Sequence, residues 1–180
     1  EIIKHAAIRD AEMFELIENV AAGHGGVADL IARNVAIKAR IVEADEHETI
    51  GLRALLNFGH TLGHAIENAA GYGRLLHGEA ISLGLIAAAR ISAKLSHFPA
   101  EDVARIFDLL KLFSLPVQLP DDLDDAEILG AMKPDKKFEA GRIRFVLLRR
   151  LGDAFVSDAV TIDHLTQAVL ELRTFQGPQS

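Results

Sequence analysis

Apolar residues recur at the spacing of an α-helix along most of this chain, as Ile31 and Val35 do four residues apart. Asp10, Pro99 and Asp124 are residue types that favour the start of a helix. Glycine and proline interrupt the apolar pattern between the periodic stretches. The pattern predicts helices over residues 1–8, 10–23, 27–44, 55–69, 77–96, 99–113, 124–132 and 162–173.

The longest of these helices, over residues 77–96, is apolar on nearly all sides. A helix at a protein surface keeps one polar face, whereas a helix that is apolar all round is buried at the centre of a bundle. We therefore expect the other helices to pack around this one.

One segment near the C-terminus departs from the helical pattern. Ile143 and Phe145 alternate with arginines, which predicts a β-strand. A turn at a glycine then leads to a second strand over residues 154–156. The sequence thus predicts a mainly α fold, a multi-helix bundle with one small β-hairpin, in a single domain spanning residues 1–180.

Composition narrows the classes of function. The chain is 49% hydrophobic and 25% charged, as expected of a globular domain, and its net charge of −7 argues against a nucleic-acid binder. A local basic pocket for a small anion remains compatible with that charge. Cysteine is absent, which excludes disulfides and thiolate metal sites. The longest apolar run stops at Arg90, well short of the roughly 20 residues of a membrane span.

Three histidines, His60, His64 and His77, lie close together in the sequence, with Gly59 and Gly63 beside the first two. His60 and His64 are four residues apart, which places them on one face of a helix. Imidazole and carboxylate groups suit Zn²⁺ or a similar divalent ion. Glycine inside a helix costs about 1 kcal/mol relative to alanine, so we expect substrate or a neighbouring helix to approach the backbone here.

Other interpretations of these residues stay open at this point. The two-histidine helix of metalloproteases carries a glutamate after the first histidine, and Thr61 stands there instead. A single histidine in an apolar segment is more often a hydrogen-bonded core residue than a ligand, and Glu79 would ordinarily only favour its helix N-terminus. Surface or loop positions are expected for the remaining histidines, which are His5, His24, His47, His97 and His164.

Several segments together resemble the 3-dehydroquinate synthase family. They are residues 52–67, residues 76–80, Asp45 and Glu46 with Glu48, residues 135–137, and Glu1 with Lys4. The resemblance extends from residue 1 to about residue 152 and implies the helical C-terminal domain of that family. The N-terminal α/β domain, which holds most of the NAD site, is expected to lie outside these 180 residues, so the isolated chain is expected to lack NAD-dependent turnover.

The resemblance implies a shikimate-pathway enzyme that converts 3-deoxy-D-arabino-heptulosonate 7-phosphate into 3-dehydroquinate and phosphate. NAD would act catalytically: a hydroxyl is oxidised, phosphate is eliminated, the ketone is reduced back, and the ring opens and recloses by an aldol step. Glu1, His60 and His77 would hold a divalent metal, zinc or cobalt, with substrate hydroxyls at the open positions. The resemblance also implies a cytoplasmic enzyme, often a homodimer.

The resemblance also assigns roles to polar residues. His64 matches an active-site histidine near the phosphate, although spacing alone pairs it with His60 as a ligand. Glu48 matches a carboxylate that orients Lys38 or the histidines. The residues that would grip substrate carboxylate, phosphate or hydroxyl groups are Lys4, Lys38, Arg53, Asn57, His64 and Lys136, the last preferred over Lys137. The catalytic set would be His64, Lys38, Glu48, Arg53 and Asn57.

The sequence departs from the family pattern at His47, where an arginine is usual, and in one extra residue before Gly51. Three other functions remain open: a related sugar phosphate cyclase, a metal-dependent polyol dehydrogenase of similar fold, and a non-catalytic helical module. A carboxylate-binding Arg53 favours the synthase over another cyclase. Lys136 and His64 argue against the dehydrogenase, which needs no residues that bind phosphate.

Overall fold

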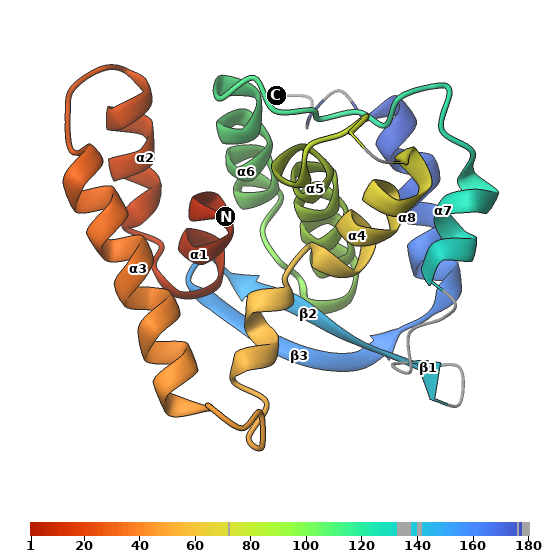
Figure 1. The fold of residues 1–180 in the computed structure, drawn as a ribbon, viewed down its shortest axis with the longest axis horizontal. Coiled ribbons are helices and arrows are strands. Elements are labelled where there is room, and N and C mark those ends of the chain that lie inside the picture. Colours follow the sequence, from red (N-terminus) through yellow and green to blue (C-terminus); the bar gives the residue numbers. More distant parts are fainter. Residues whose placement is uncertain (72, 133–137, 140–141, 176, 178–180) are drawn as a thin grey trace.

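The computed structural model describes residues 1–71, 73–132, 138–139, 142–175 and 177. Its elements in chain order are α1 (Ile2–Arg9), α2 (Met13–Ala21), α3 (Val27–Ala44), the 3₁₀ helix η1 (Arg53–Asn57), α4 (His60–Ala70), α5 (His77–Ser96), α6 (Ala100–Leu112), α7 (Asp125–Met132), β1 (Phe138–Glu139), β2 (Arg142–Arg150), β3 (Asp153–Val160) and α8 (Ile162–Thr174). Figure 1 shows the helices gathered over the long strands β2 and β3. The predicted mainly α fold with a small β element is confirmed.

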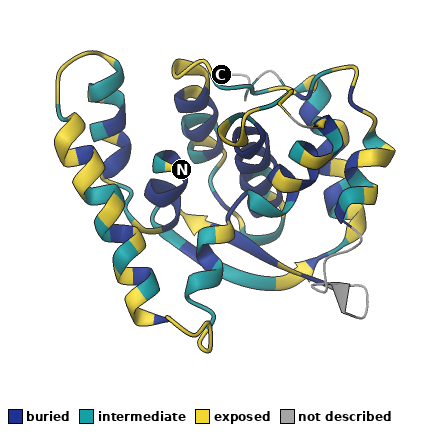
Figure 2. Ribbon diagram, in the orientation of Figure 1, coloured by how far each residue is buried: buried dark blue, intermediate teal, exposed yellow. Residues whose placement is uncertain are grey.

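Helix α5 forms the centre of the bundle, as its sequence predicts. Every residue from 80 to 89 is buried, and α4, α6, α8 and β2 all pack against this helix. Figure 2 shows its ribbon mostly in the dark blue of buried residues. Two of its serines bind the adjacent strand: Ser92 Oγ accepts from Leu148 N at 3.0 Å, and Ser96 Oγ donates to Leu148 O at 2.7 Å.

The sheet is antiparallel with strand order β1-β2-β3. Strand β3 begins at Asp153 and reaches Val160, so it is longer than the predicted segment of residues 154–156. The predicted strand at Ile143 and Phe145 is confirmed, and these two side chains are buried, but Val146 and Leu148 are buried as well. Register shifts interrupt the pairing near both ends of β2, and α5, α1 and η1 contact the two long strands. The simple two-residue alternation therefore fails here.

Two predicted helix starts were wrong. Asp10 does not cap the second helix, because it ends α1 and its carboxylate accepts two hydrogen bonds from Arg33, at 2.9 and 2.8 Å. The residue before α2 is Glu12. The helix expected from residue 55 begins at His60, because Gly59 has a φ of +76° and separates it from the 3₁₀ turn η1.

Helix α3 covers one side of the molecule and keeps an apolar stripe in solvent. Val27, Ile31 and Val35 lie four residues apart along it, and each is more than half exposed, at 54%, 53% and 59%. A different face of α3, with Leu30, Ile37 and Ile41, is buried. Among the described residues, no helix is both long enough and apolar enough to cross a membrane.

Candidate metal centre

The crossing of α4 over α5 depends on three glycines. A Cβ on Gly59 would lie 2.8 Å from Leu85 N, and a Cβ on Gly63 would lie 2.7 Å from Ile81 Cδ1. A Cβ on Gly84 would overlap the carbonyl oxygen of Gly59 and lie 2.8 Å from Gly63 N. The backbones can approach this closely only without side chains. The expectation that a neighbouring helix comes close to Gly59 and Gly63 is confirmed.

This close crossing brings the three histidines together. The ring centroids of His60 and His64 are 5.2 Å apart, and those of His60 and His77 are 5.6 Å apart. The rings of His64 and His77 are separated by 5.7 Å. One ring nitrogen from each histidine lies within 4.8 Å of the other two, a spacing that allows a shared metal ion.

The carboxylate of Glu1 joins this cluster from the start of α1. Its Oε1 lies 3.1 Å from His60 Nε2, and its Oε2 accepts a hydrogen bond of 2.9 Å from Lys4 Nζ. The hydrogen bond with His60, with Lys4 adding to it, holds the pKa of Glu1 well below its usual range against the opposing effect of burial. Glu1 is therefore a carboxylate at neutral pH, which is the form that binds a cation.

His60 and His77 each use Nδ1 for a hydrogen bond to another residue, which leaves Nε2 of each ring available to the cluster. His60 Nδ1 lies 3.1 Å from the carbonyl oxygen of Phe58, and His77 Nδ1 lies 3.1 Å from Glu67 Oε2. Partners of this kind fix the orientation of metal-binding imidazoles. The sequence prediction gave Glu67 no role, although its position seven residues after His60 places it on the same helix face.

The donor set fits a divalent cation. His60 faces a carbonyl oxygen through Nδ1 and a carboxylate through Nε2, so a neutral imidazole, with one N–H, can satisfy only one of them. A metal bound at Nε2 and at Glu1 would satisfy both groups. Nitrogen and oxygen donors without sulfur suit Zn²⁺ and similar ions.

The loop before η1 and the first residue of η1 carry two of the predicted substrate-binding and catalytic residues, Glu48 and Arg53. Arg53 Nε pairs with Glu48 Oε1 at 3.2 Å, so Glu48 contacts Arg53 rather than Lys38 or a histidine. Asp45, which is buried, accepts hydrogen bonds from Ile50 N at 3.1 Å and from Arg53 N at 3.0 Å. The bond from the Arg53 backbone is the main cause of the lowered pKa of Asp45. Asp45 thus fixes the loop that presents Arg53.

Three further predicted residues differ in exposure. Lys4 is buried, and burial lowers its pKa, while Glu1 acts in the opposite direction. Lys38 is exposed on α3, yet its charge also lowers the pKa of Lys4, so the two ammonium groups are near each other. Asn57 is exposed at the end of η1. Lys136 and Lys137 lie outside the described residues.

Comparison with known proteins places the chain in a family. The model of the C-terminal part of 3-dehydroquinate synthase matches residues 1–138. The chain belongs to this family. A 3-dehydroquinate synthase from Opitutus terrae is 44% identical over 176 residues, which cover 96% of this chain and 49% of that protein. The chain thus spans about half the length of this curated relative.

Solved structures of two synthases share the fold. A 2-epi-5-epi-valiolone synthase from Streptomyces hygroscopicus, solved with NAD⁺ and Zn²⁺ bound, matches with a TM-score of 0.79 at 28% identity, over 95% of this chain and 49% of that chain. A 2-deoxy-scyllo-inosose synthase complexed with carbaglucose-6-phosphate, NAD⁺ and Co²⁺ matches with a TM-score of 0.69 at 24% identity, over 79% of this chain and 41% of that chain. The second likeness shows the fold alone.

One of the histidines expected at surface or loop positions, His5, lies in the interior of this member of the 3-dehydroquinate synthase family. His5 is only 2% exposed, because every residue of α1 from Ile3 to Ile8 is buried and the helix reaches solvent at its ends, at Ile2 and Arg9. His164 lies in the first turn of α8, where its ring nitrogen accepts a hydrogen bond of 3.1 Å from Thr161 N. Glu79 has the structural role expected of it, accepting from Leu76 N at 2.7 Å.

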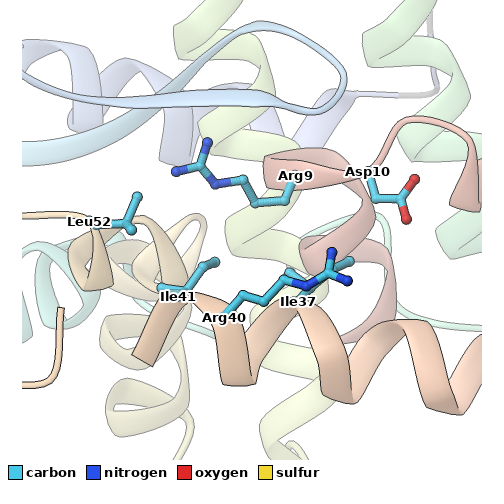
Figure 3. Close-up of a pocket in the computed structure, with 6 residues that line it drawn as sticks. All are labelled: Arg9, Asp10, Ile37, Arg40, Ile41 and Leu52. Atoms are coloured by element: carbon cyan, nitrogen blue, oxygen red, sulfur yellow. The ribbon is translucent and has the colours of Figure 1, made fainter. Parts of the chain in front are cut away.

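A separate pocket of about 300 Å³ lies between α1 and α3, and none of the three clustered histidines lines it. Figure 3 shows Arg9 and Asp10 from α1 on one side of the pocket and Arg40, Ile37 and Ile41 from α3 on the other, with Leu52 at one end. Its charged lining is mixed, with two arginines and the carboxylate of Asp10.

Proposed function

We propose that this chain is the metal- and substrate-binding half of a 3-dehydroquinate synthase, which converts 3-deoxy-D-arabino-heptulosonate 7-phosphate into 3-dehydroquinate and phosphate. The observation that carries the proposal is the meeting of Glu1, His60, His64 and His77 from three separate helical segments, in a member of that family. The other half of the active site, including the NAD site, would come from sequence beyond these 180 residues.

In this proposal Glu1, His60 and His77 hold the divalent cation. When bound, the cation would polarise a substrate hydroxyl and stabilise negative charge developing on its oxygen. Glu67 and the carbonyl of Phe58 would keep the two imidazoles turned towards it. The close crossing at the glycines of α4 and α5 makes this geometry rigid.

The remaining groups would bind and orient the substrate. His64 is exposed at the edge of the histidine cluster, where it can donate to the substrate phosphate. Arg53 offers a planar pair of N–H donors that match the substrate carboxylate, and Asp45 holds its backbone. Lys4, Lys38, Asn57 and Lys136 would bind the remaining oxygens, and Glu48 would orient the Arg53 guanidinium, with which it pairs.

A related sugar phosphate cyclase is the second candidate, because a 2-epi-5-epi-valiolone synthase matches 95% of the length of this chain. The carboxylate of the substrate separates the two candidates. The synthase requires Arg53 to contact that carboxylate, whereas a cyclase acting on a sugar phosphate without one does not.

Calorimetry on the Zn²⁺-loaded chain tests this choice with 3-deoxy-D-arabino-heptulosonate 7-phosphate and with a heptulose phosphate lacking the carboxylate. We expect tighter binding of the carboxylate-bearing compound, and a loss of about 10-fold or more in Arg53→Gln, because a charge-assisted hydrogen bond contributes about 1.5–3 kcal/mol. Arg150→Gln, at an exposed strand position, is the control and should bind normally. Equal binding of both compounds would favour the other cyclase.

The NAD-binding partner domain is proposed on the same grounds. The exposed stripe of Val27, Ile31 and Val35 on α3 is a surface on which another domain or subunit, such as the second copy of a homodimer, would pack. We expect no phosphate release from the 180-residue chain with substrate and NAD. Measurable release would contradict the placing of the NAD site beyond this chain.

A further inference from the structure

One buried side chain beside the metal centre has no role in the proposal so far. His5 is 2% exposed, and its Nε2 is buried and has no hydrogen-bond partner among the described residues. A buried polar atom normally has a partner, because leaving it unpaired loses the hydrogen bond it made with water. The position of this atom therefore needs an explanation.

His5 lies between an amide and a proposed metal ligand. Its Nδ1 is 2.6 Å from Asn34 Oδ1, and its Nε2 is 3.9 Å from Glu1 Oε2. The other oxygen of the same carboxylate lies 3.1 Å from His60 Nε2. The Glu1 carboxylate thus stands between His5 on one side and His60 on the other.

The hydrogen-bonding groups are compatible with a direct bond from His5 to Glu1. The amide of Asn34 offers an acceptor in one orientation and a donor after a half turn, and the donor orientation leaves the ring proton of His5 on Nε2. His5 is fixed inside α1, whereas the Glu1 side chain is 43% exposed and its carboxylate lies between Lys4 and His60. A small rotation of Glu1 would bring Oε2 to the N–H···O distance of about 2.7–3.2 Å.

We infer that His5 is a positioning residue for the metal ligand Glu1: Nε2–H donates to Oε2, and Oε1 is thereby turned towards the cation held with His60. Lys4 already binds Oε2 at 2.9 Å, and a carboxylate oxygen accepts two donors. The imidazole of His5 is a rigid ring fixed inside α1, so His5 sets the direction of the carboxylate together with Lys4. This inference rests on the proposed metal centre.

Two substitutions separate the proposed role from a purely structural one. In His5→Gln the amide nitrogen lies as many bonds from Cα as Nε2, so a donor towards Glu1 is kept. In His5→Asn the amide lies as many bonds from Cα as Nδ1, so only the contact with Asn34 is kept. The measurement is the dissociation constant for Zn²⁺ by competition with a chromophoric chelator, with thermal unfolding monitored beside it. His24→Gln, in an exposed loop, is the control.

We expect His5→Gln and His24→Gln to bind Zn²⁺ like the unmodified protein, and His5→Asn to bind it about 10-fold more weakly, the usual effect of losing a partner of a metal ligand. Wild-type affinity in His5→Asn, or a larger loss in His5→Gln than in His5→Asn, would overturn the inference. Zn²⁺ binding by His60→Ala distinguishes a wrong role for His5 from a wrong metal centre. Lost binding in His60→Ala with unchanged binding in His5→Asn refutes the role of His5 alone, whereas unchanged binding in His60→Ala refutes the centre itself.

A measurement on the unmodified protein does not depend on how the variants fold. The Nε2–H proton of His5 should become a slowly exchanging NMR signal when Zn²⁺ is added, because the rotated Glu1 carboxylate then accepts it. Absence of that signal in the Zn²⁺-bound protein, with His60 shown to be bound, would contradict the inference.

Discussion

Substituting Gly84 by alanine tests whether the close helix crossing builds the site. The new Cβ would overlap the carbonyl oxygen of Gly59 and lie 2.8 Å from Gly63 N, and both obstructing atoms belong to the backbone of the facing segment. Backbone atoms cannot rotate away as a flexible side chain can. The two helices must therefore separate by several tenths of an ångström or more.

The magnitude follows from two opposing effects. Overpacking a core typically costs about 1–3 kcal/mol, and replacing a glycine inside a helix by alanine gains about 1 kcal/mol. Because the clash is with backbone, we place its cost at the upper end of that range and expect Gly84→Ala to lower the free energy of unfolding by about 2 kcal/mol. For a chain of this length, that corresponds to a fall in Tm of about 4–8 °C.

Urea unfolding measures the change, and Gly130→Ala is its matched control. Gly130 lies in α7, and a Cβ there would meet nothing within 4 Å, so alanine should stabilise by up to about 1 kcal/mol. Separation of α4 from α5 should also weaken Zn²⁺ binding in Gly84→Ala, because His60 belongs to α4 and His77 belongs to α5. A Gly84→Ala protein as stable as Gly130→Ala would refute this reasoning.

Two further predictions concern charges. Burial raises the pKa of Glu171, but hydrogen bonds from Lys94 and Arg90 outweigh burial and lower that pKa from 4.5 to about 2. The carboxylate therefore stabilises the fold above pH 4.5, and this contribution disappears as the pH falls towards 2. Glu171→Gln should therefore cost about 1–2 kcal/mol in urea unfolding at pH 7 and almost nothing near pH 2; equal costs at both would contradict it. Glu67→Ala should weaken Zn²⁺ binding about 10-fold in chelator competition through its hydrogen bond to His77, and unchanged affinity would remove Glu67 from the site.

Local pattern was sufficient for the long helices. Helices α3 and α5 have the bounds that the sequence predicts, because Gly23, Gly25 and Gly26 precede one and the turn at Gly71 and Gly73 precedes the other. The start of α4 could not be placed in the same way. The sequence does not show whether a glycine has a positive φ or a helical conformation. The predicted helix therefore includes both Gly59 and Gly63, although Gly59 has a positive φ.

Burial of α1 also required the assembled fold. Its eight residues offer too short a window to show that α3, α2, α6, η1 and the sheet would enclose it. His5 was therefore assigned to the surface, and its approach to Glu1 was missed. The pairings of Glu67 with His77 and of Glu48 with Arg53 depend on how separate segments meet. The spacing of residues within one helix does not predict such contacts between segments.

Spacing and family resemblance assign the clustered histidines differently. Spacing alone favoured His60 and His64 as a ligand pair, whereas the resemblance assigned the metal to His60, His77 and Glu1. The structure brings Glu1 to 3.1 Å from His60 and places all three histidines within reach of one ion. The role of His64 therefore rests on the proposed function and needs its own test.

Zinc stoichiometry by equilibrium dialysis tests the central claim most directly, on His60→Ala, His77→Ala, His64→Ala and the control His24→Ala. The account predicts that His60→Ala and His77→Ala lose the tightly bound ion, while His64→Ala and His24→Ala retain it. Retention of one tightly bound zinc in both His60→Ala and His77→Ala would contradict the account.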